Sequence, residues 1–118
     1  MVPADPDNAP KLHHSERRHD QRKKVAVEAE LHTAGYGAPL RVKTADLSTI
    51  GCYIEMMFTL EVGAKLKIGL WINGAKLNAE GVVITRDPQV GNGIQLSGMA
   101  AQDRETLKRF LATTAEET

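Results

Sequence analysis

The sequence predicts a mainly β fold, a small barrel or sandwich of antiparallel strands capped by one C-terminal helix. Apolar and polar residues alternate repeatedly between residues 25 and 96, as in half-buried strands. The pair Asn73-Gly74 lies between two apolar runs, which is a strong hairpin signal. After Ser97 the apolar period lengthens to that of an amphipathic helix. Strands joined by short turns and followed by one helix favour this architecture.

Each predicted strand has one set of side chains that we expect to face the core. These are Val25, Val27, Ala29 and Leu31; Leu40, Val42 and Thr44; Cys52, Ile54 and Met56; Leu66, Ile68, Leu70 and Ile72; and Leu77 and Ala79. The run Val82-Val83-Ile84 breaks the alternation, which indicates a bulge at Gly81 or a fully buried strand. Asp87-Pro88 ends that strand, and residues 93–96 form one more short strand.

The ends of the chain differ from its centre. Residues 1–14 hold three of the five prolines and lack periodicity, so we predict a disordered N-terminal arm. Residues 15–112 form the predicted domain, and residues 113–118 a flexible tail. The helix of about three turns within the domain presents Leu107, Phe110 and Leu111 to the core.

Composition limits the class of protein. A chain of 118 residues suits one domain, and an aromatic content of 4% requires an aliphatic core. The formal net charge is zero, yet five basic residues gather between residues 16 and 24. A local basic cluster in a neutral protein fits a compact anionic ligand better than a long polyanion.

The same composition suggests a compartment. Cys52 is the single cysteine, so no internal disulfide forms, and we expect it in the core rather than as a nucleophile. The first twenty-four residues lack the apolar run of a signal peptide, and no stretch approaches the ~20 apolar residues of a membrane span. We therefore expect a cytoplasmic protein without membrane insertion.

Two short motifs carry most of the functional information. The first is Arg18-His-Asp-Gln-Arg22, and the second is Asp46-Leu-Ser48-Thr-Ile-Gly51, with residues 23–45 between them. Each alone is ordinary, a solvated basic run and a turn stabilised by side-chain bonds. In this order and at this distance, the pair resembles the signature of the PilZ domain, a bacterial receptor module for cyclic di-GMP. Gly91-Asn-Gly93-Ile-Gln-Leu96 resembles a weaker C-terminal pattern of that family.

The resemblance implies a six-stranded antiparallel barrel of the PilZ-like, split-barrel type, with a nucleotide-binding site on its outside. The arginine segment is then expected to fold over the ligand. The implied cyclic di-GMP ligands in this chain are Arg17, Arg18, Arg22, Asp46, Ser48 and Gly51. A basic residue at position 17 further implies, by family resemblance, two stacked ligand molecules rather than one.

The chemistry of these residues suits such a ligand. Guanidinium groups match phosphates and the O6/N7 edge of guanine, because both accept a fork of parallel hydrogen bonds. The Asp46 carboxylate can accept from guanine N1–H and N2–H, which adenine does not present in that form. Ser48 can bond the ligand or brace the turn, and Gly51 permits a positive φ or a close backbone approach.

Other functions have less support. We expect no enzyme, no cofactor and no metal: Ser48 lacks obvious His and Asp partners, and His13, His14 and His19 lack further ligands at suitable spacing. The expected output is second-messenger signalling to a partner protein, for which Trp71 is a candidate anchor. Two alternatives stay open, a protein-interaction module of the same fold that does not bind nucleotide and a general nucleic-acid-binding barrel. The scarcity of stacking aromatics disfavours a nucleic acid polymer as ligand.

Overall fold

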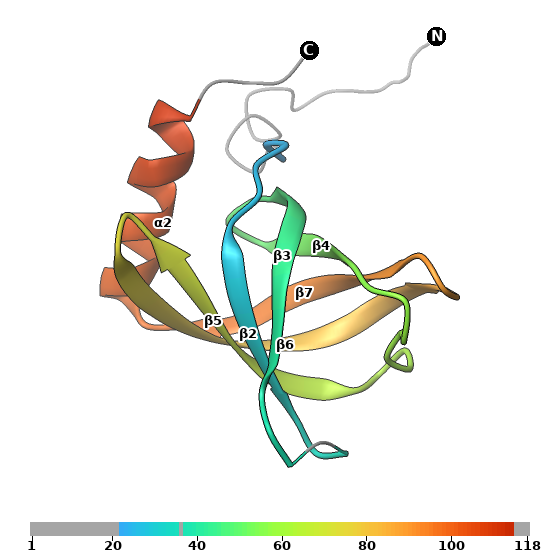
Figure 1. The fold of residues 1–118 in the computed structure, drawn as a ribbon. Coiled ribbons are helices and arrows are strands. Elements are labelled where there is room, and N and C mark those ends of the chain that lie inside the picture. Colours follow the sequence, from blue (N-terminus) through green and yellow to red (C-terminus); the bar gives the residue numbers. More distant parts are fainter. Residues whose placement is uncertain (1–21, 36, 115–118) are drawn as a thin grey trace, which may run out of the picture.

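The computed structural model describes residues 22–35 and 37–114, which form a closed antiparallel barrel followed by one helix (Figure 1). The elements are β2 (Glu28–Thr33), β3 (Leu40–Leu47), β4 (Gly51–Glu55), β5 (Lys65–Ile72), β6 (Ala75–Asp87), β7 (Gly91–Met99) and α2 (Ala101–Thr113). Around the barrel the strands follow the order β2-β3-β4-β7-β6-β5, and β2 closes it by pairing with β5. The expected six-stranded antiparallel barrel with a C-terminal helix is confirmed.

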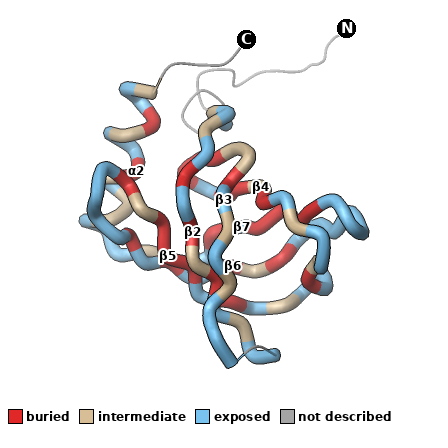
Figure 2. The backbone as a smooth tube through the Cα atoms, viewed as in Figure 1, coloured by how far each residue is buried: buried red, intermediate tan, exposed pale blue. Residues whose placement is uncertain are grey.

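The barrel encloses an aliphatic core, as the low aromatic content predicted. Side chains of alternate residues point inward from every strand, because successive Cβ atoms lie on opposite faces of a sheet. The fully enclosed ones include Leu31, Leu47, Ile54, Ile68, Leu70, Ile72 and Ile94. Figure 2 shows buried positions recurring along the strands, and α2 adds Leu107 and Leu111 to the same core. Val25, Leu40, Val42 and Met56, also expected to face inward, are only partly buried and pack against this core.

The predicted hairpin is present between β5 and β6. Asn73 and Gly74 have φ angles of 52° and 84°, the positive values that a type I′ turn needs at both central residues. The strands pair on either side of it from Ile72 with Ala75 to Lys65 with Val82. The tight turn therefore sets the register that places Leu77 and Ala79 in the core.

The interruption of alternation in β6 is a bulge. Pairing with β7 shifts between Glu80 and Gly81, and shifts again between Val83 and Thr85. A register shift does lie beside Gly81, but its extra residue is Ser97 of β7, and the extra residue of β6 itself is Ile84. The bulge predicted at Gly81 is therefore misplaced within β6, and a fully buried strand is excluded because Ile84 is exposed. The following exposed turn begins after Asp87, where the sequence placed the end of the strand. The last strand, β7, is longer than the predicted residues 93–96, since pairing with β4 and β6 extends it.

Several single-residue predictions can be compared with the fold. Cys52 lies in the core as predicted, and burial raises the pKa of its thiol to about 12. Trp71 is half-buried between Arg41 and Lys76, whose cationic groups lie 5.0 Å and 5.3 Å from its ring centre. Its role as a partner anchor stays a prediction. Helix α2 ends at Thr113, beside the predicted boundary at 112, and residues 1–14 lie outside the described part of the chain.

A buried asparagine fastens the loop between β4 and β5 to the barrel. Asn92 is fully buried on β7, where its Oδ1 accepts from Leu60 N–H at 2.7 Å. Its Nδ2 donates to the carbonyl oxygens of Leu60 at 2.8 Å and Thr85 at 3.1 Å. The amide thus satisfies the backbone N–H and carbonyl of Leu60, which lies outside the strands.

Replacing this amide should destabilise the domain. We expect Asn92→Ala to lower the free energy of unfolding by about 2–3 kcal/mol, because buried backbone groups of Leu60 lose their partners. Urea denaturation followed by circular dichroism measures the change. The exposed Asn78→Ala on β6 is the matched control and should stay within ~0.5 kcal/mol of the wild type. Equal stability of Asn92→Ala and wild type would contradict this assignment.

Candidate functional site

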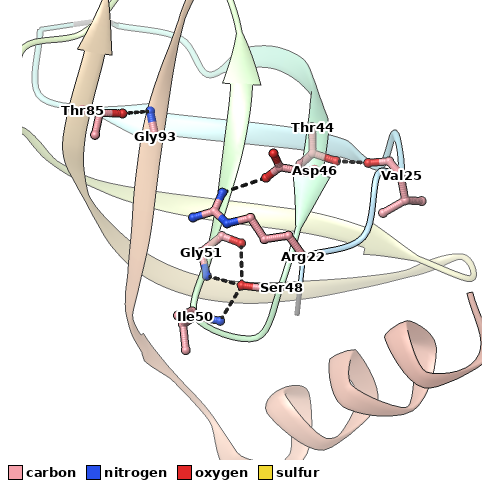
Figure 3. A network of polar contacts seen from close by, with 9 residues as sticks. All are labelled: Arg22, Val25, Thr44, Asp46, Ser48, Ile50, Gly51, Thr85 and Gly93. Atoms are coloured by element: carbon pink, nitrogen blue, oxygen red, sulfur yellow. Dashed lines mark hydrogen bonds and ion pairs between the residues drawn. The ribbon is translucent and has the colours of Figure 1, made fainter. Parts of the chain in front are cut away.

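An ion pair joins the two sequence motifs on the outside of the barrel. The Arg22 Nη1 atom lies 2.8 Å from Asp46 Oδ1, and the two side chains are 44% and 26% exposed. Backbone bonds beside the pair hold it in place, since Lys23 and Leu47 exchange two N–H···O bonds of 2.9 Å each. Figure 3 shows the Arg22 side chain reaching across to Asp46. Arg22 and Asp46, which are 24 positions apart in sequence, are therefore neighbours in space.

Thr44 supplies a second attachment for the segment that follows Arg22. Its Oγ1 donates to the carbonyl oxygen of Val25 at 2.7 Å and accepts from the N–H of Val27 at 3.0 Å. The side chain is buried, so both bonds are shielded from water. Sequence reasoning placed Thr44 inward but gave it no role, because nothing local shows that its hydroxyl meets a segment seventeen or nineteen residues away.

An irregularity in β3 turns Asp46 outward. Pairing with β4 runs from Thr44 with Ile54 to Asp46 with Tyr53, so Ala45 is the extra residue. Thr44 and Leu47 are both buried, whereas Asp46 is partly exposed. Uninterrupted alternation from Thr44 would have directed Asp46 into the core. The bulge thus delivers the carboxylate to the surface where Arg22 lies.

Ser48 braces the turn between β3 and β4. Its Oγ accepts from the N–H groups of Ile50 and Gly51, each at 3.2 Å, and lies 3.3 Å from the Gly51 carbonyl oxygen. The backbone N–H of Ser48 also donates to that carbonyl at 2.8 Å. The side chain is fully buried, so of the two roles considered for Ser48 the structure displays the bracing one.

Gly51 is required by close packing against β7. A Cβ at this position would lie 2.5 Å from the carbonyl oxygen of Ile94, closer than any real Cβ contact. The positive-φ glycines of the described chain are Gly63 and Gly74, so a special φ is not the reason for Gly51. Of the two explanations offered from sequence, close backbone approach is the correct one.

The outer face continues from Asp46 onto β4, β7 and β6. Tyr53 lies opposite Asp46, Gly93 opposite Tyr53, and Thr85 opposite Gly93. The Tyr53 hydroxyl donates to Asp87 Oδ2 at 2.7 Å, and Thr85 Oγ1 accepts from Gly93 N–H at 3.0 Å. Sequence analysis did not select Tyr53 or Thr85, since only the strand register brings them beside the motifs.

Helix α2 also contacts the motif turn. Arg104 Nη1 donates to the carbonyl oxygen of Thr49 at 3.1 Å, across 55 positions of sequence. Thr49 lies between Ser48 and Gly51, so the bond connects the helix directly to the second motif. Sequence analysis assigned Arg104 no role and missed this contact.

The remaining predicted residues lie outside the described chain. These are Arg17 and Arg18 of the implied ligand set and the histidines His13, His14 and His19. Within residues 22–35 and 37–114, no group of three His, Cys, Asp or Glu side chains is placed to hold a metal ion. The same part of the chain contains no helix long and apolar enough to cross a membrane.

A family model described as "PilZ domain" matches residues 16–113, most of the chain. The chain belongs to the PilZ domain family. A search of curated proteins found no match. The family assignment agrees with the resemblance read from the two motifs and the six-stranded barrel.

Solved structures share the PilZ fold at low sequence identity. The Bacillus subtilis inhibitor of motility MotI/DgrA has a TM-score of 0.70 and 17% identity, over 81% of this chain and 50% of its own. The PilZ domain of CeSA from a cellulose synthesizing bacterium has a TM-score of 0.62 and 18% identity, over 78% of this chain and 96% of its own. Borreliella burgdorferi PlzA, solved in complex with c-di-GMP, has a TM-score of 0.59 and 14% identity, over 88% of this chain and 42% of its own. This chain thus corresponds to about half of the motility inhibitor.

The Thr44 attachment can be tested with an isosteric change. We expect Thr44→Val to lower the free energy of unfolding by about 1–3 kcal/mol, because Val25 and Val27 lose their buried hydrogen-bond partner. Thermal and urea unfolding measure this loss. Thr33→Val, at the less buried end of β2, is the matched control and should leave stability nearly unchanged.

The packing of Gly51 gives a second test. Gly51→Ala should destabilise the domain by about 1–3 kcal/mol, because the backbone at Ile94 must move to accept a methyl group. At Gly98, also on the barrel wall, a Cβ would meet ordinary contacts at 3.6 Å, so Gly98→Ala should be neutral or slightly stabilising. Equal unfolding midpoints for the two variants would contradict this explanation of Gly51.

Proposed function

We propose that this PilZ domain is a cyclic di-GMP receptor, a non-enzymatic adaptor that signals to a partner protein in the cytoplasm. The observation that carries the proposal is the 2.8 Å ion pair between Arg22 and Asp46. It brings together a guanidinium and a carboxylate from the two motifs, on an exposed face and next to a rigid turn. These are the groups that a phosphate and a guanine base require.

Asp46 and Arg22 would contact different groups of the ligand. Asp46 accepts from guanine N1–H and N2–H, which gives preference for guanine over adenine. Arg22 offers a planar fork of donors to a phosphate or to the O6/N7 edge of a base. Ser48 and Gly51 contribute by holding the turn that fixes the direction of Asp46. A carboxylate that is already held in place favours binding, because less conformational entropy is lost when the ligand binds.

The existing ion pair need not oppose binding. Its partners are 44% and 26% exposed, and pairs at the surface contribute only ~0–1 kcal/mol to stability. A ligand that offers a phosphate to Arg22 and two N–H donors to Asp46 exchanges one weak interaction for several charge-assisted bonds. The pair therefore keeps both groups in position without a large cost on release.

Signalling would follow from the arginine segment. In this proposal Arg17, Arg18 and Arg22 close over the ligand, and the surface offered to a partner changes when they do. Arg17 would favour a stacked pair of ligand molecules. The c-di-GMP complex of the similar PlzA protein supports the ligand, and the similar B. subtilis protein, an inhibitor of motility, supports a regulatory output.

Calorimetric titration tests the proposed ligand. Cyclic di-GMP should bind the full chain, whereas cyclic di-AMP should give no heat because it lacks the N1–H and N2–H donors that Asp46 accepts. Arg22→Ala should weaken binding about 5- to 150-fold, since a bidentate contact is worth roughly 1–3 kcal/mol. Arg109→Ala, which removes an exposed arginine of α2, is the matched control and should bind like wild type. The molar ratio of the wild-type titration tests the stacked pair.

The opposite result would favour the alternative function. If wild-type protein gives neither heat nor a shift in its thermal unfolding midpoint with cyclic di-GMP, the receptor proposal fails. The fold would then be that of an interaction module that does not bind nucleotide. If Arg22→Ala binds cyclic di-GMP as tightly as wild type, the ligand assignment stands but the Arg22–Asp46 ion pair is not part of the binding site.

A further inference from the structure

One aromatic ring lies beside the second motif on the outer face of the barrel. Tyr53 of β4 is the direct cross-strand neighbour of Asp46 of β3. The Cβ atoms of such pairs are roughly 4.5–5.5 Å apart and point to the same face. Any flat ligand group whose edge meets the Asp46 carboxylate while lying along the sheet would therefore extend over Tyr53.

The ring is held against the barrel by contacts with β7 and β6, which lie on the other side of β4 from Asp46. Its hydroxyl donates to Asp87 Oδ2 of β6 at 2.7 Å, so the side chain spans β7. A Cβ at Gly91 of β7 would lie 2.8 Å and 2.9 Å from two ring carbons, which shows that the ring rests on that glycine. Gly93, opposite Tyr53, adds no side chain that could cover the ring. The result is a fixed, half-exposed aromatic surface.

The other aromatic side chains within the described residues are not placed for this role. Trp71 is occupied by Arg41 and Lys76, and Phe110 packs against the core. Phe58 is highly exposed but lines a hollow with Leu40 and Val42, at the far end of β3 from Asp46. Tyr53 is the aromatic residue that the strand register places next to the motif.

We infer that Tyr53 is the platform on which one guanine of the ligand stacks, with the edge of that base directed at Asp46. This inference rests on the proposed function and adds a binding residue that the two motifs do not contain. Bases stack on aromatic side chains in single-stranded nucleic-acid recognition, and a ring fixed in advance loses little conformational entropy on binding. Stacking supplies affinity, while Asp46 supplies the choice of guanine.

The bond to Asp87 serves this arrangement in two ways. It fixes the ring orientation, and it raises the pKa of the Tyr53 hydroxyl to about 12. A tyrosine hydroxyl is already neutral near physiological pH at its ordinary pKa of about 10, so the raised pKa only widens the pH range in which the ring carries no charge. The hydroxyl occupies one oxygen of Asp87, which reduces the free acceptor capacity beside the site.

Two substitutions separate the ring from its anchor. Tyr53→Leu removes the ring and should weaken cyclic di-GMP binding about tenfold in calorimetry, within the range of single base–aromatic stacks. Tyr53→Phe keeps the ring and loses the bond to Asp87, so it should retain affinity within about threefold of wild type. Phe58→Leu removes an exposed ring far from Asp46 and should bind like wild type. Unfolding midpoints of all variants identify any loss of folded protein.

A spectroscopic test uses the unaltered protein. The chain has two tyrosines, so the aromatic ¹H–¹³C signals of Tyr53 are assigned by their disappearance in Tyr53→Phe. On addition of cyclic di-GMP these signals should move upfield because of the ring current of a stacked purine. The same experiment on Phe58→Leu should give the same shift.

The possible results distinguish the stacking role of Tyr53 from the receptor proposal on which it rests. Normal wild-type binding with unchanged affinity in Tyr53→Leu, or with unmoved Tyr53 signals, overturns the stacking role and leaves the receptor proposal intact. Equal losses in Tyr53→Leu and Tyr53→Phe also overturn it, because the anchor rather than the ring would then matter. Absence of wild-type binding overturns the receptor proposal and this inference together.

Discussion

The bulge at Ala45 in β3 is the constraint on which the candidate site depends. It lets Thr44 and Leu47 face the core while Asp46 faces outward. Thr44 then holds the segment after Arg22, and the exchange of backbone bonds between Leu47 and Lys23 lies next to it. A single extra residue thus orients the carboxylate and its attachment points at once. Bulges are common beside functional sites because they redirect one side chain without changing the fold.

The second motif is built as a rigid part of the barrel. Ser48 satisfies the backbone of its own turn, and Gly51 allows that turn to approach β7 more closely than a side chain would permit. Neither residue needs a ligand to explain its position. The groups that we propose for recognition are the charged pair Arg22 and Asp46, which lies on the surface beside this turn (Figure 3). In this proposal Ser48 and Gly51 hold the shape of the site, and Arg22 and Asp46 supply the groups that would contact the ligand.

The structure also contains a path from the motif turn to a different surface. Arg104 of α2 bonds to the carbonyl of Thr49, while Leu107 and Leu111 of the same helix pack into the core. The motif turn is therefore in direct contact with a helix whose opposite side is exposed (Figure 2). For a receptor whose output is a partner protein, such a contact offers a physical link between the two surfaces.

The sequence alone determined the strands, the Asn73-Gly74 hairpin, the helix, the aliphatic core and the two motifs, because each is encoded in local periodicity or turn chemistry. It also indicated the family, which the match to residues 16–113 confirmed. The register of the strands around the barrel, the outward direction of Asp46, the hydroxyl bonds of Thr44 and the place of Tyr53 were decided by tertiary structure. These features depend on strand register and on a one-residue bulge, and a shift of one residue exchanges the two faces of a strand. Local patterns carry no information on which distant strand lies alongside, so the residues around the motifs appear only when the barrel closes.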